Sequence, residues 1–254
     1  MYKEMKVYLL LSIVLFAFVM AGCSGSGKSD INTEDPDKAF EMAKSNYDKK
    51  DYVQAIEDFS LIKVKFSGTN ISDKAQYFLG MSYLKQKEYI LAAYEFEYLL
   101  KNYATSQYSV DGRFQLAMCY FGMSPKWALD QMYTRQAITE FKNFLELYPT
   151  DKNAPEAEAR IKELRNKLAL KEIKSAELYH TMDDYKAATL YYDNIVNEYF
   201  DTDYADDALY GKIRMLIIRK KYEDAKKEIE RFETKFTGSN LLVKVKNLKN
   251  SLPY

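Results

Sequence analysis

The chain has 254 residues with 37 basic and 37 acidic side chains, 47% hydrophobic residues and 23 tyrosines, but only nine glycines and five prolines. This charge balance argues against a nucleic-acid-binding surface, and one histidine with two cysteines cannot supply a zinc site of the usual spacing or a disulfide framework. Few glycines and prolines, with abundant Lys, Glu and Ala, predict an all-α fold with a large core. We therefore expect no metal and no cofactor.

The first residues of the chain indicate a targeting signal. Two lysines precede an apolar run over residues 7–21, which is too short to span a membrane and fits the core of a signal peptide. Small residues then lead to Cys23, as in the lipobox of bacterial lipoproteins, so we expect removal of residues 1–22 and diacylation of Cys23. A plain secretory signal with a coincidental cysteine is the alternative. Ser24 favours delivery to the outer membrane, and residues 23–35 are expected to be a flexible tether.

A helical pattern recurs five times along the rest of the chain. In each copy a small residue stands three residues after the first residue, and a large apolar residue stands four residues after the small one. This spacing places the first, the small and the large residue on one face of a helix. The copies begin at Tyr52, Tyr89, Thr134, Tyr185 and Tyr222, and their small residues are Ala55, Ala92, Ala137, Ala188 and Ala225. The pattern resembles the second helix of a tetratricopeptide repeat. That resemblance implies five helical hairpins in a right-handed superhelical solenoid.

Two spacings between copies are longer than one repeat, and each excess has a visible location. In the third repeat an eight-residue insertion lies between Phe121 and Tyr133 and contains Trp127. Before the fourth repeat, residues 155–182 hold no glycine or proline after the first position, which predicts one long helix.

The long helix is expected to connect two parts of the solenoid. The N-terminal part, residues 36–133, holds repeats one to three with the insertion. The C-terminal part, residues 134–254, holds the second helix of repeat three, the long helix and repeats four and five. Apolar residues at helical spacing within the lysine-rich segment 235–249 predict a capping helix at the end.

The lipobox, the short tether, five repeats with aromatic spacers, the insertion in the third repeat and the long helix before the fourth together resemble the BamD family of outer-membrane assembly lipoproteins. The resemblance covers essentially the whole chain after residue 22. It implies a protein anchored by its lipid on the periplasmic face of the outer membrane. It also implies that the C-terminal repeats dock on a POTRA domain of a BamA-like barrel insertase. The N-terminal repeats would receive unfolded outer-membrane proteins, with no bond chemistry.

In such solenoids the first helix of each repeat lines the concave groove. We expect exposed side chains three before, one after and four after the small residue of that helix. In the first three repeats these are Phe40, Lys44 and Tyr47, then Tyr77, Met81 and Leu84, then Phe114, Met118 and Phe121. Such an adaptable apolar surface suits the alternating apolar strands of barrel substrates. Lys44, Lys74 or Arg113 could bind a chain-terminal carboxylate. Packing only between helices is the alternative role for each aromatic residue.

Contact with the insertase is expected in the first helix of the fifth repeat, through Arg214 and Arg219 with Tyr210 beside them. The partner-pairing arginine of the family corresponds to a position nearer Ile217, so this chain departs from the family pattern there. Solvent-exposed arginines without a partner are the alternative. For Trp127 two roles stay open, as an anchor for a partner or as a cover folded back over its own repeat.

A different periplasmic tetratricopeptide lipoprotein, one that scaffolds envelope or cell-wall machinery, is the alternative function. Co-purification of a POTRA-bearing barrel protein separates the two. An enzyme is not expected, because the sequence holds no recognisable Ser/His/Asp order, paired-carboxylate pocket, glycine-rich phosphate loop or metal cluster.

Overall fold

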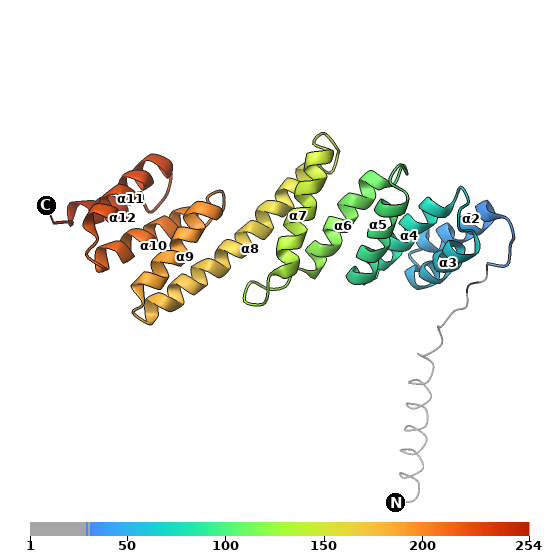
Figure 1. Ribbon diagram of the computed structural model, residues 1–254, viewed down its shortest axis with the longest axis horizontal. Coiled ribbons are helices and arrows are strands. Elements are labelled where there is room, and N and C mark those ends of the chain that lie inside the picture. The colour runs from blue at the N-terminus through green and yellow to red at the C-terminus, as the bar shows by residue number, and fades with distance from the viewer. Residues whose placement is uncertain (1–28, 30, 254) are drawn as a thin grey trace, which may run out of the picture. The chain divides into compact units, whose positions relative to one another are not determined.

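The computed structural model describes residue 29 and residues 31–253. This part of the chain is helical apart from turns and linkers, which confirms the predicted all-α class (Figure 1). The predicted signal peptide 1–22 and the predicted lipidation site Cys23 lie outside the described residues. Within the described residues, no helix combines the length and the apolar character needed to cross a membrane.

The described helices form five hairpins and one closing helix, as the repeat pattern predicts. The hairpins are α2 (Pro36–Asp48) with α3 (Tyr52–Lys65), α4 (Ser72–Lys85) with α5 (Tyr89–Asn102), α6 (Ser109–Met123) with α7 (Met132–Leu147), α8 (Ala154–Thr181) with α9 (Tyr185–Glu198), and α10 (Ala205–Ile218) with α11 (Tyr222–Lys235). The closing helix is α12 (Leu242–Asn250), at the predicted capping position.

The helices form two compact units. Along the chain, the boundary between the units lies between Ala75 and Gln76, within α4. The first unit holds α2, α3 and the start of α4, and the second holds the rest of α4 and all later helices. The predicted division between residues 133 and 134 lies within α7 and stays a prediction. Because α7 packs against both α6 and α8, the contacts of the second unit continue across that position.

Small residues allow the two helices of a hairpin to pack closely. The alanine of every second helix is 0% exposed, at Ala55, Ala92, Ala137, Ala188 and Ala225. In two first helices a glycine lets a second helix approach closely, the one of its own hairpin at Gly80 and the one of the preceding hairpin at Gly211. A β-carbon at Gly80 would lie 2.9 Å from the ring of Phe96, and one at Gly211 would lie 2.5 Å from the ring of Tyr192. At such close contacts even one added methyl group is felt by the core.

Four of the hairpins turn on a residue with left-handed backbone geometry. These residues are Lys50, Lys87, Asp183 and Lys220, with φ of 66°, 63°, 58° and 57°. After Lys87, the N–H of Glu88 bonds to the carbonyl of Tyr83 at 2.9 Å, as in a Schellman motif. The third hairpin instead carries the loop 124–131, which is the insertion predicted from the long spacing.

The long helix α8 takes part in two hydrophobic cores of the second unit. Leu164 and Leu168 belong to a core shared with α5, α6 and α7. Ala169 and Ile173 belong to a core shared with α9, α10, α11 and α12. One continuous helix, packed on α7 and on α9, therefore connects the two cores (Figure 1). The helix found at Ala154–Thr181 confirms the prediction for residues 155–182.

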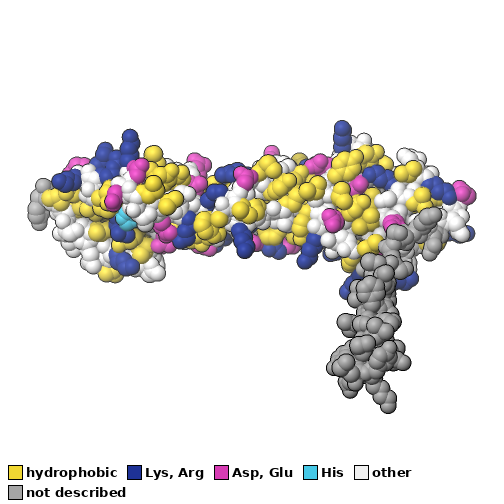
Figure 2. All heavy atoms as spheres, turned by 90° about the horizontal axis from the view of Figure 1, so that it is seen from below, with side chains coloured by type: hydrophobic (Ala, Val, Ile, Leu, Met, Phe, Trp, Pro, Cys, Tyr) yellow, Lys and Arg dark blue, Asp and Glu magenta, His cyan; other side chains and the backbone are white. Residues whose placement is uncertain are grey.

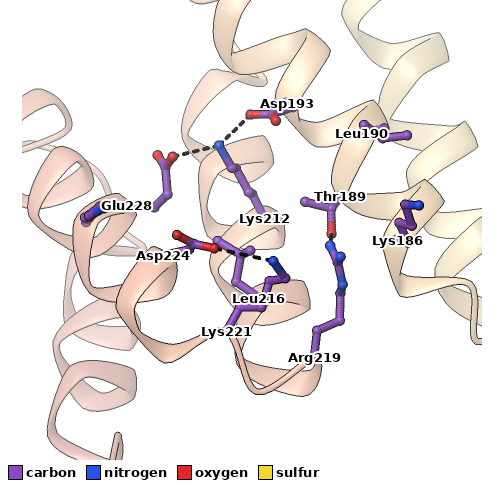
Figure 3. Close-up of a pocket in the computed structure, with 11 residues that line it drawn as sticks. Lys186, Thr189, Leu190, Asp193, Lys212, Leu216, Arg219, Lys221, Asp224 and Glu228 are labelled. Atoms are coloured by element: carbon purple, nitrogen blue, oxygen red, sulfur yellow. Dashed lines mark hydrogen bonds and ion pairs between the residues drawn. The ribbon is translucent and has the colours of Figure 1, made fainter.

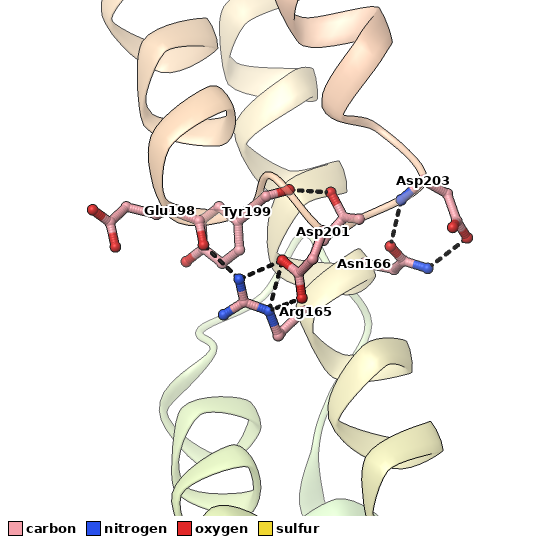
Figure 4. Close-up of polar contacts among 7 residues, drawn as sticks. Arg165, Asn166, Glu198, Tyr199, Asp201 and Asp203 are labelled. Carbon is pink, nitrogen blue, oxygen red and sulfur yellow. Dashed lines mark hydrogen bonds and ion pairs between the residues drawn. The ribbon is translucent and has the colours of Figure 1, made fainter. Parts of the chain in front are cut away.

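The same helix also holds the linker between α9 and α10 (Figure 4). Arg165 donates through Nε to Asp201 at 2.8 Å and through Nη2 to the carbonyl of Glu198 at 2.6 Å. Asn166 donates to the carboxylate of Asp203 at 2.7 Å and accepts from the N–H of Asp203 at 3.0 Å. Hydrogen bonds from Arg165 lower the pKa of Asp201, so this carboxylate stays charged at neutral pH. The linker is thus fixed to α8 on both sides of its bend.

The end of the predicted flexible tether is fixed in the first unit. Ile31 is only 7% exposed. Nζ of Lys65 on α3 donates to the carbonyl of Thr33 at 2.9 Å and pairs with Glu34 at 2.8 Å. An apolar side chain and one lysine therefore attach residues 31–35 to the helices, and the flexibility predicted for residues 23–35 stays a prediction.

Gly211→Ala is expected to lower the free energy of unfolding by about 1–3 kcal/mol, because the added carbon would lie 2.5 Å from the Tyr192 ring. This overpacking outweighs the roughly 1 kcal/mol by which a helix favours alanine over glycine. Urea unfolding followed by circular dichroism measures the change. Gly238→Ala is the control, since no atom lies within 4 Å of the carbon added there. A stability of Gly211→Ala equal to wild type would contradict the close packing.

Candidate functional site

Two of the predicted groove residues are buried rather than exposed. Phe40 is 6% exposed and its ring lies 5.8 Å from that of Phe59. Phe114 is 4% exposed and its ring lies 5.4 Å from that of Phe144. The predicted exposure of Phe40 and Phe114 is wrong, because each of these two rings packs against the second helix of its own hairpin.

The other predicted groove residues of the first unit lie at the end of α2. Lys44 pairs with Asp48 at 2.5 Å, one helical turn further along. The ring of Tyr47 lies 5.5 Å from that of Tyr52, at the start of α3. Both side chains are half-buried, and their contacts stabilise the α2–α3 turn.

In the second unit five predicted groove residues are half-buried, and all of them except Leu84 form an aromatic and methionine surface on α4 and α6. These four are Tyr77, Met81, Met118 and Phe121, all packed against the same core. Tyr77 donates a hydrogen bond to Asp111 and stacks on Tyr108, with ring centroids 4.7 Å apart. The guanidinium of Arg160 on α8 lies 4.7 Å from the centre of the Phe121 ring. We call these four residues the aromatic–methionine surface.

The polar neighbours of this surface could not be predicted from the groove positions. Tyr108 lies five residues after Tyr103, the recurrent aromatic residue of its spacer, and only Tyr204 is an aromatic residue at the corresponding position of another spacer. Asp111 and Arg160 carry no such signal, because their contacts join residues 34 and 39 positions apart in different helices.

The three cations proposed for a terminal carboxylate have different surroundings. Lys44 is paired with Asp48, and Lys74 pairs with Asp37 at 3.3 Å while lying 4.4 Å from the Phe40 ring centre. Nε of Arg113 is buried without a hydrogen-bond partner among the described residues. An incoming carboxylate would therefore displace an existing ion pair at either lysine but not at this nitrogen.

Two of the three predicted partner-binding residues lie together, and the third lies apart from them. Arg214 is exposed and lies 5.8 Å from the ring centre of Tyr210, one turn earlier on α10. Arg219 lies on another side of the helix end and donates to the hydroxyl of Thr189 on α9 at 3.2 Å. A separation of five residues turns a side chain by about 140° around an α-helix, which explains the division.

Arg219 lines a pocket of about 380 Å³ between α9, α10 and α11 (Figure 3). Five of the lining side chains are basic and three are acidic. Lys212, only 8% exposed, points between Asp193 and Glu228 and pairs with them at 2.5 Å and 2.7 Å. Burial alone would lower the pKa of Lys212, but hydrogen bonds to the two carboxylates raise it overall, so the ammonium stays charged. We call this the basic pocket.

The buried lysine of the basic pocket escaped sequence analysis. Lys212 lies on α10 directly before Ile213, which occupies the core position of that helix and is 0% exposed. A charged residue beside a core position is ordinarily a solvated side chain. Its two partners, Glu228 and Asp193, lie 16 and 19 residues away in sequence and on other helices. A single sequence does not reveal such a pairing.

The insertion in the third repeat is a rigid loop. The amide of Gln131, which is 1% exposed, donates to the carbonyls of Lys126 and Leu129 at 2.9 Å and 3.0 Å. From α8, Nζ of Lys171 donates to the carbonyl of Leu129 at 2.7 Å. Trp127 is 36% exposed on this loop and does not fold completely over its repeat.

The described residues hold no group of three or more His, Cys, Asp or Glu side chains placed to bind a metal ion. Cys119 is buried, and burial raises the pKa of its thiol to about 12. The thiol is therefore protonated at neutral pH and serves as part of the core.

Comparison with known proteins gives one family and two curated relatives. The model of the YfiO family, described as outer membrane lipoprotein, matches residues 32–219. Outer membrane protein assembly factor BamD of Caulobacter vibrioides is 21% identical over 243 residues, which cover 94% of this chain and 80% of the relative. The BamD of Pasteurella multocida is 22% identical over 207 residues, covering 78% of this chain and 79% of the relative.

Among solved structures, two helical repeat proteins are similar to the chain at low identity. A TPR repeats protein of Bacteroides fragilis is 16% identical with a TM-score of 0.48, covering 87% of this chain and 98% of that one. A tetratricopeptide repeat protein of Parabacteroides merdae is 15% identical with a TM-score of 0.40, covering 79% of each chain.

Lys212→Met is expected to lower the free energy of unfolding at pH 7 by about 1–3 kcal/mol, because it leaves two carboxylates facing each other in a partly exposed site. The raised pKa of Lys212 means that its stabilisation is present below the unfolded value of about 10.4 and is lost as the pH rises through the folded value. The difference from wild type should therefore shrink only above about pH 10.

Guanidinium unfolding at pH 7 and at alkaline pH measures this effect. Lys227→Met is the control, because Lys227 lines the same pocket without an ion pair among the described residues. If both variants were equally stable, the Lys212 triad would not be what holds α10 between α9 and α11.

Proposed function

The chain belongs to the YfiO family of outer membrane lipoproteins, and we propose that it is a non-enzymatic binding subunit in the assembly of outer-membrane proteins. The observation that carries the proposal is the family match over residues 32–219, from the last part of the tether to the end of α10. Two curated relatives, each named outer membrane protein assembly factor BamD, support the assembly role.

The proposed location is the periplasmic side of the outer membrane, with the lipid on Cys23 as the anchor. The apolar run at residues 7–21 and the small residues before Cys23 support it. Residues 31–35 attach to the first unit, so only the short stretch 24–30 separates the proposed lipid from the folded chain. Fully extended, that stretch spans about 25 Å, which would keep the repeats near the membrane surface.

The proposed receiver for unfolded outer-membrane proteins is the aromatic–methionine surface, with Arg113 as its cation. Half-buried methionine and aromatic side chains adapt to different apolar partners at a low cost in desolvation. Nε of Arg113 has no hydrogen-bond partner among the residues that the structure describes, so a terminal carboxylate would satisfy a buried donor and gain a charge-assisted hydrogen bond. In the first unit, Lys44 and Tyr47 are the proposed contacts.

The proposed docking region for a POTRA-bearing barrel insertase is the fifth repeat. The excess of basic over acidic side chains in the basic pocket supports an acidic contact on the partner. Arg219 contributes from inside the pocket, while Tyr210 and Arg214 offer a separate aromatic and cationic contact on α10. Exposed ion pairs contribute only about 0–1 kcal/mol each, so the pocket would carry more of the affinity than Arg214.

A peptide with the sequence of a carboxyl-terminal barrel strand tests the receiver. The double variant Met81→Gln with Met118→Gln is expected to bind it about tenfold more weakly, because polar amides replace apolar contacts of similar length. Arg113→Gln is expected to bind the free-acid peptide and its carboxamide form equally, whereas wild type prefers the free acid. Fluorescence anisotropy with a labelled peptide measures both effects.

Met182→Gln is the matched control, since this methionine is 64% exposed and lies at the end of α8, outside the proposed receiver. Circular dichroism melts establish that each variant is folded. Wild-type affinity in the double methionine variant would refute this surface as the receiver, and an unchanged preference in Arg113→Gln would remove Arg113 from it.

A further inference from the structure

Two pockets of the second unit lie at corresponding positions of the repeats, and their lining residues differ in charge. The basic pocket lies between α9, α10 and α11, and a second pocket of about 260 Å³ lies between α5, α6 and α7. Counted from the small residues Ala92 and Ala188, corresponding positions line both pockets. Ile90 corresponds to Lys186, and Glu97 corresponds to Asp193.

The second pocket combines tyrosine rings with a carboxylate. Tyr94, Tyr120 and Tyr133 line it together with Glu97. The hydroxyl of Tyr120 donates to Glu97 at 2.7 Å, and the rings of Tyr120 and Tyr133 are stacked with centroids 6.4 Å apart. Burial, the hydrogen bond to Glu97 and the nearby charge of Glu140 raise the pKa of Tyr120, so the phenol stays a neutral donor. We call this the tyrosine pocket.

We propose that the tyrosine pocket binds the side chain of an arginine or lysine on a partner protein. Aromatic faces attract a cation through their quadrupole, and the attraction grows when the site is partly desolvated. Glu97 adds the opposite charge at the edge of the rings. No lysine or arginine lines this pocket, whereas five line the basic pocket, so charge complementarity assigns a cation to the former and an anionic group to the latter.

The hydrogen bonding of the pocket favours a basic side chain over a quaternary ammonium headgroup of a lipid. The Glu97 carboxylate is exposed and accepts one hydrogen bond from Tyr120 through Oε1. Guanidinium and ammonium groups carry N–H donors that can bond to the remaining acceptor positions of this carboxylate, whereas a quaternary ammonium has none. The carboxylate therefore adds directional bonds only for a protein side chain.

Exposed apolar side chains beside the pocket describe the segment that carries the basic residue. Ile90 lines the pocket and is 67% exposed, and Met132, which precedes the lining residue Tyr133, is 56% exposed. The insertion is held rigid by Gln131 and by Lys171, so contact with it would cost little ordering entropy. On the face drawn in Figure 2, hydrophobic side chains gather in several patches with charged side chains between them. We expect a partner segment with apolar residues flanking one arginine or lysine.

Methyl NMR of the full-length chain in detergent micelles, with labelled isoleucine and methionine, tests the proposal independently of the assembly role. The methyl groups of Ile90 and Met123 line the pocket and serve as reporters. Titration uses the peptide acetyl-Leu-Arg-Leu-amide and the same peptide with neutral citrulline in place of arginine. We expect saturable shifts at about millimolar peptide, at least about fivefold weaker with citrulline.

Glu97→Gln and Tyr94→Leu should each weaken binding of the arginine peptide at least about threefold. Glutamine still accepts from Tyr120, and Tyr94 is 58% exposed, so both variants should fold. Glu146→Gln, which removes an exposed carboxylate of α7 outside the pocket, is the control and should bind as wild type. Equal shifts with citrulline, no loss in Glu97→Gln, or a response to choline as strong as to arginine would overturn the proposal.

Discussion

Close approach of paired helices at a small residue is the constraint on which the rest of the structure depends. The alanine of every second helix is fully buried, and Gly80 and Gly211 leave no room for a β-carbon beside the rings of Phe96 and Tyr192. Three first helices, α6, α8 and α10, therefore each pack between two second helices. This packing buries Lys212 between Asp193 and Glu228, and it places Tyr120 against Glu97. Surface chemistry then varies without altering the scaffold.

The long helix α8 converts a series of hairpins into a structure with two different binding regions. Its first part belongs to the core beneath the aromatic–methionine surface, and its second part belongs to the core beneath the basic pocket. Arg165 and Asn166 on the same helix fix the linker that leads into α10. Because one rigid helix takes part in both cores, the proposed receiver and the proposed docking region of the second unit share a common support.

The fold was largely predictable from the sequence because the repeat pattern involves residues close together in the chain. The sites depend on contacts between residues of different helices, which the pattern does not show. Spacing around Ala55 and its equivalents predicts all five hairpins, and the excess spacings locate the loop 124–131 and the long helix. The same reasoning failed for Phe114, because helical periodicity gives a face within about one residue and this ring turns toward Phe144. Lys212 was missed because its two carboxylate partners lie on other helices. Cys23 and its lipid stay predictions from sequence.

Affinity purification of the wild-type protein from native membranes, with quantitative mass spectrometry, tests the central claim most directly. The claim is that this member of the YfiO family serves outer-membrane protein assembly by binding alone. We expect a barrel protein with POTRA domains to co-purify in about equal amount, and an Arg219→Glu variant to retain less of it because the basic pocket loses its charge excess. Recovery of cell-wall or other envelope machinery without any POTRA-bearing barrel protein would contradict the account.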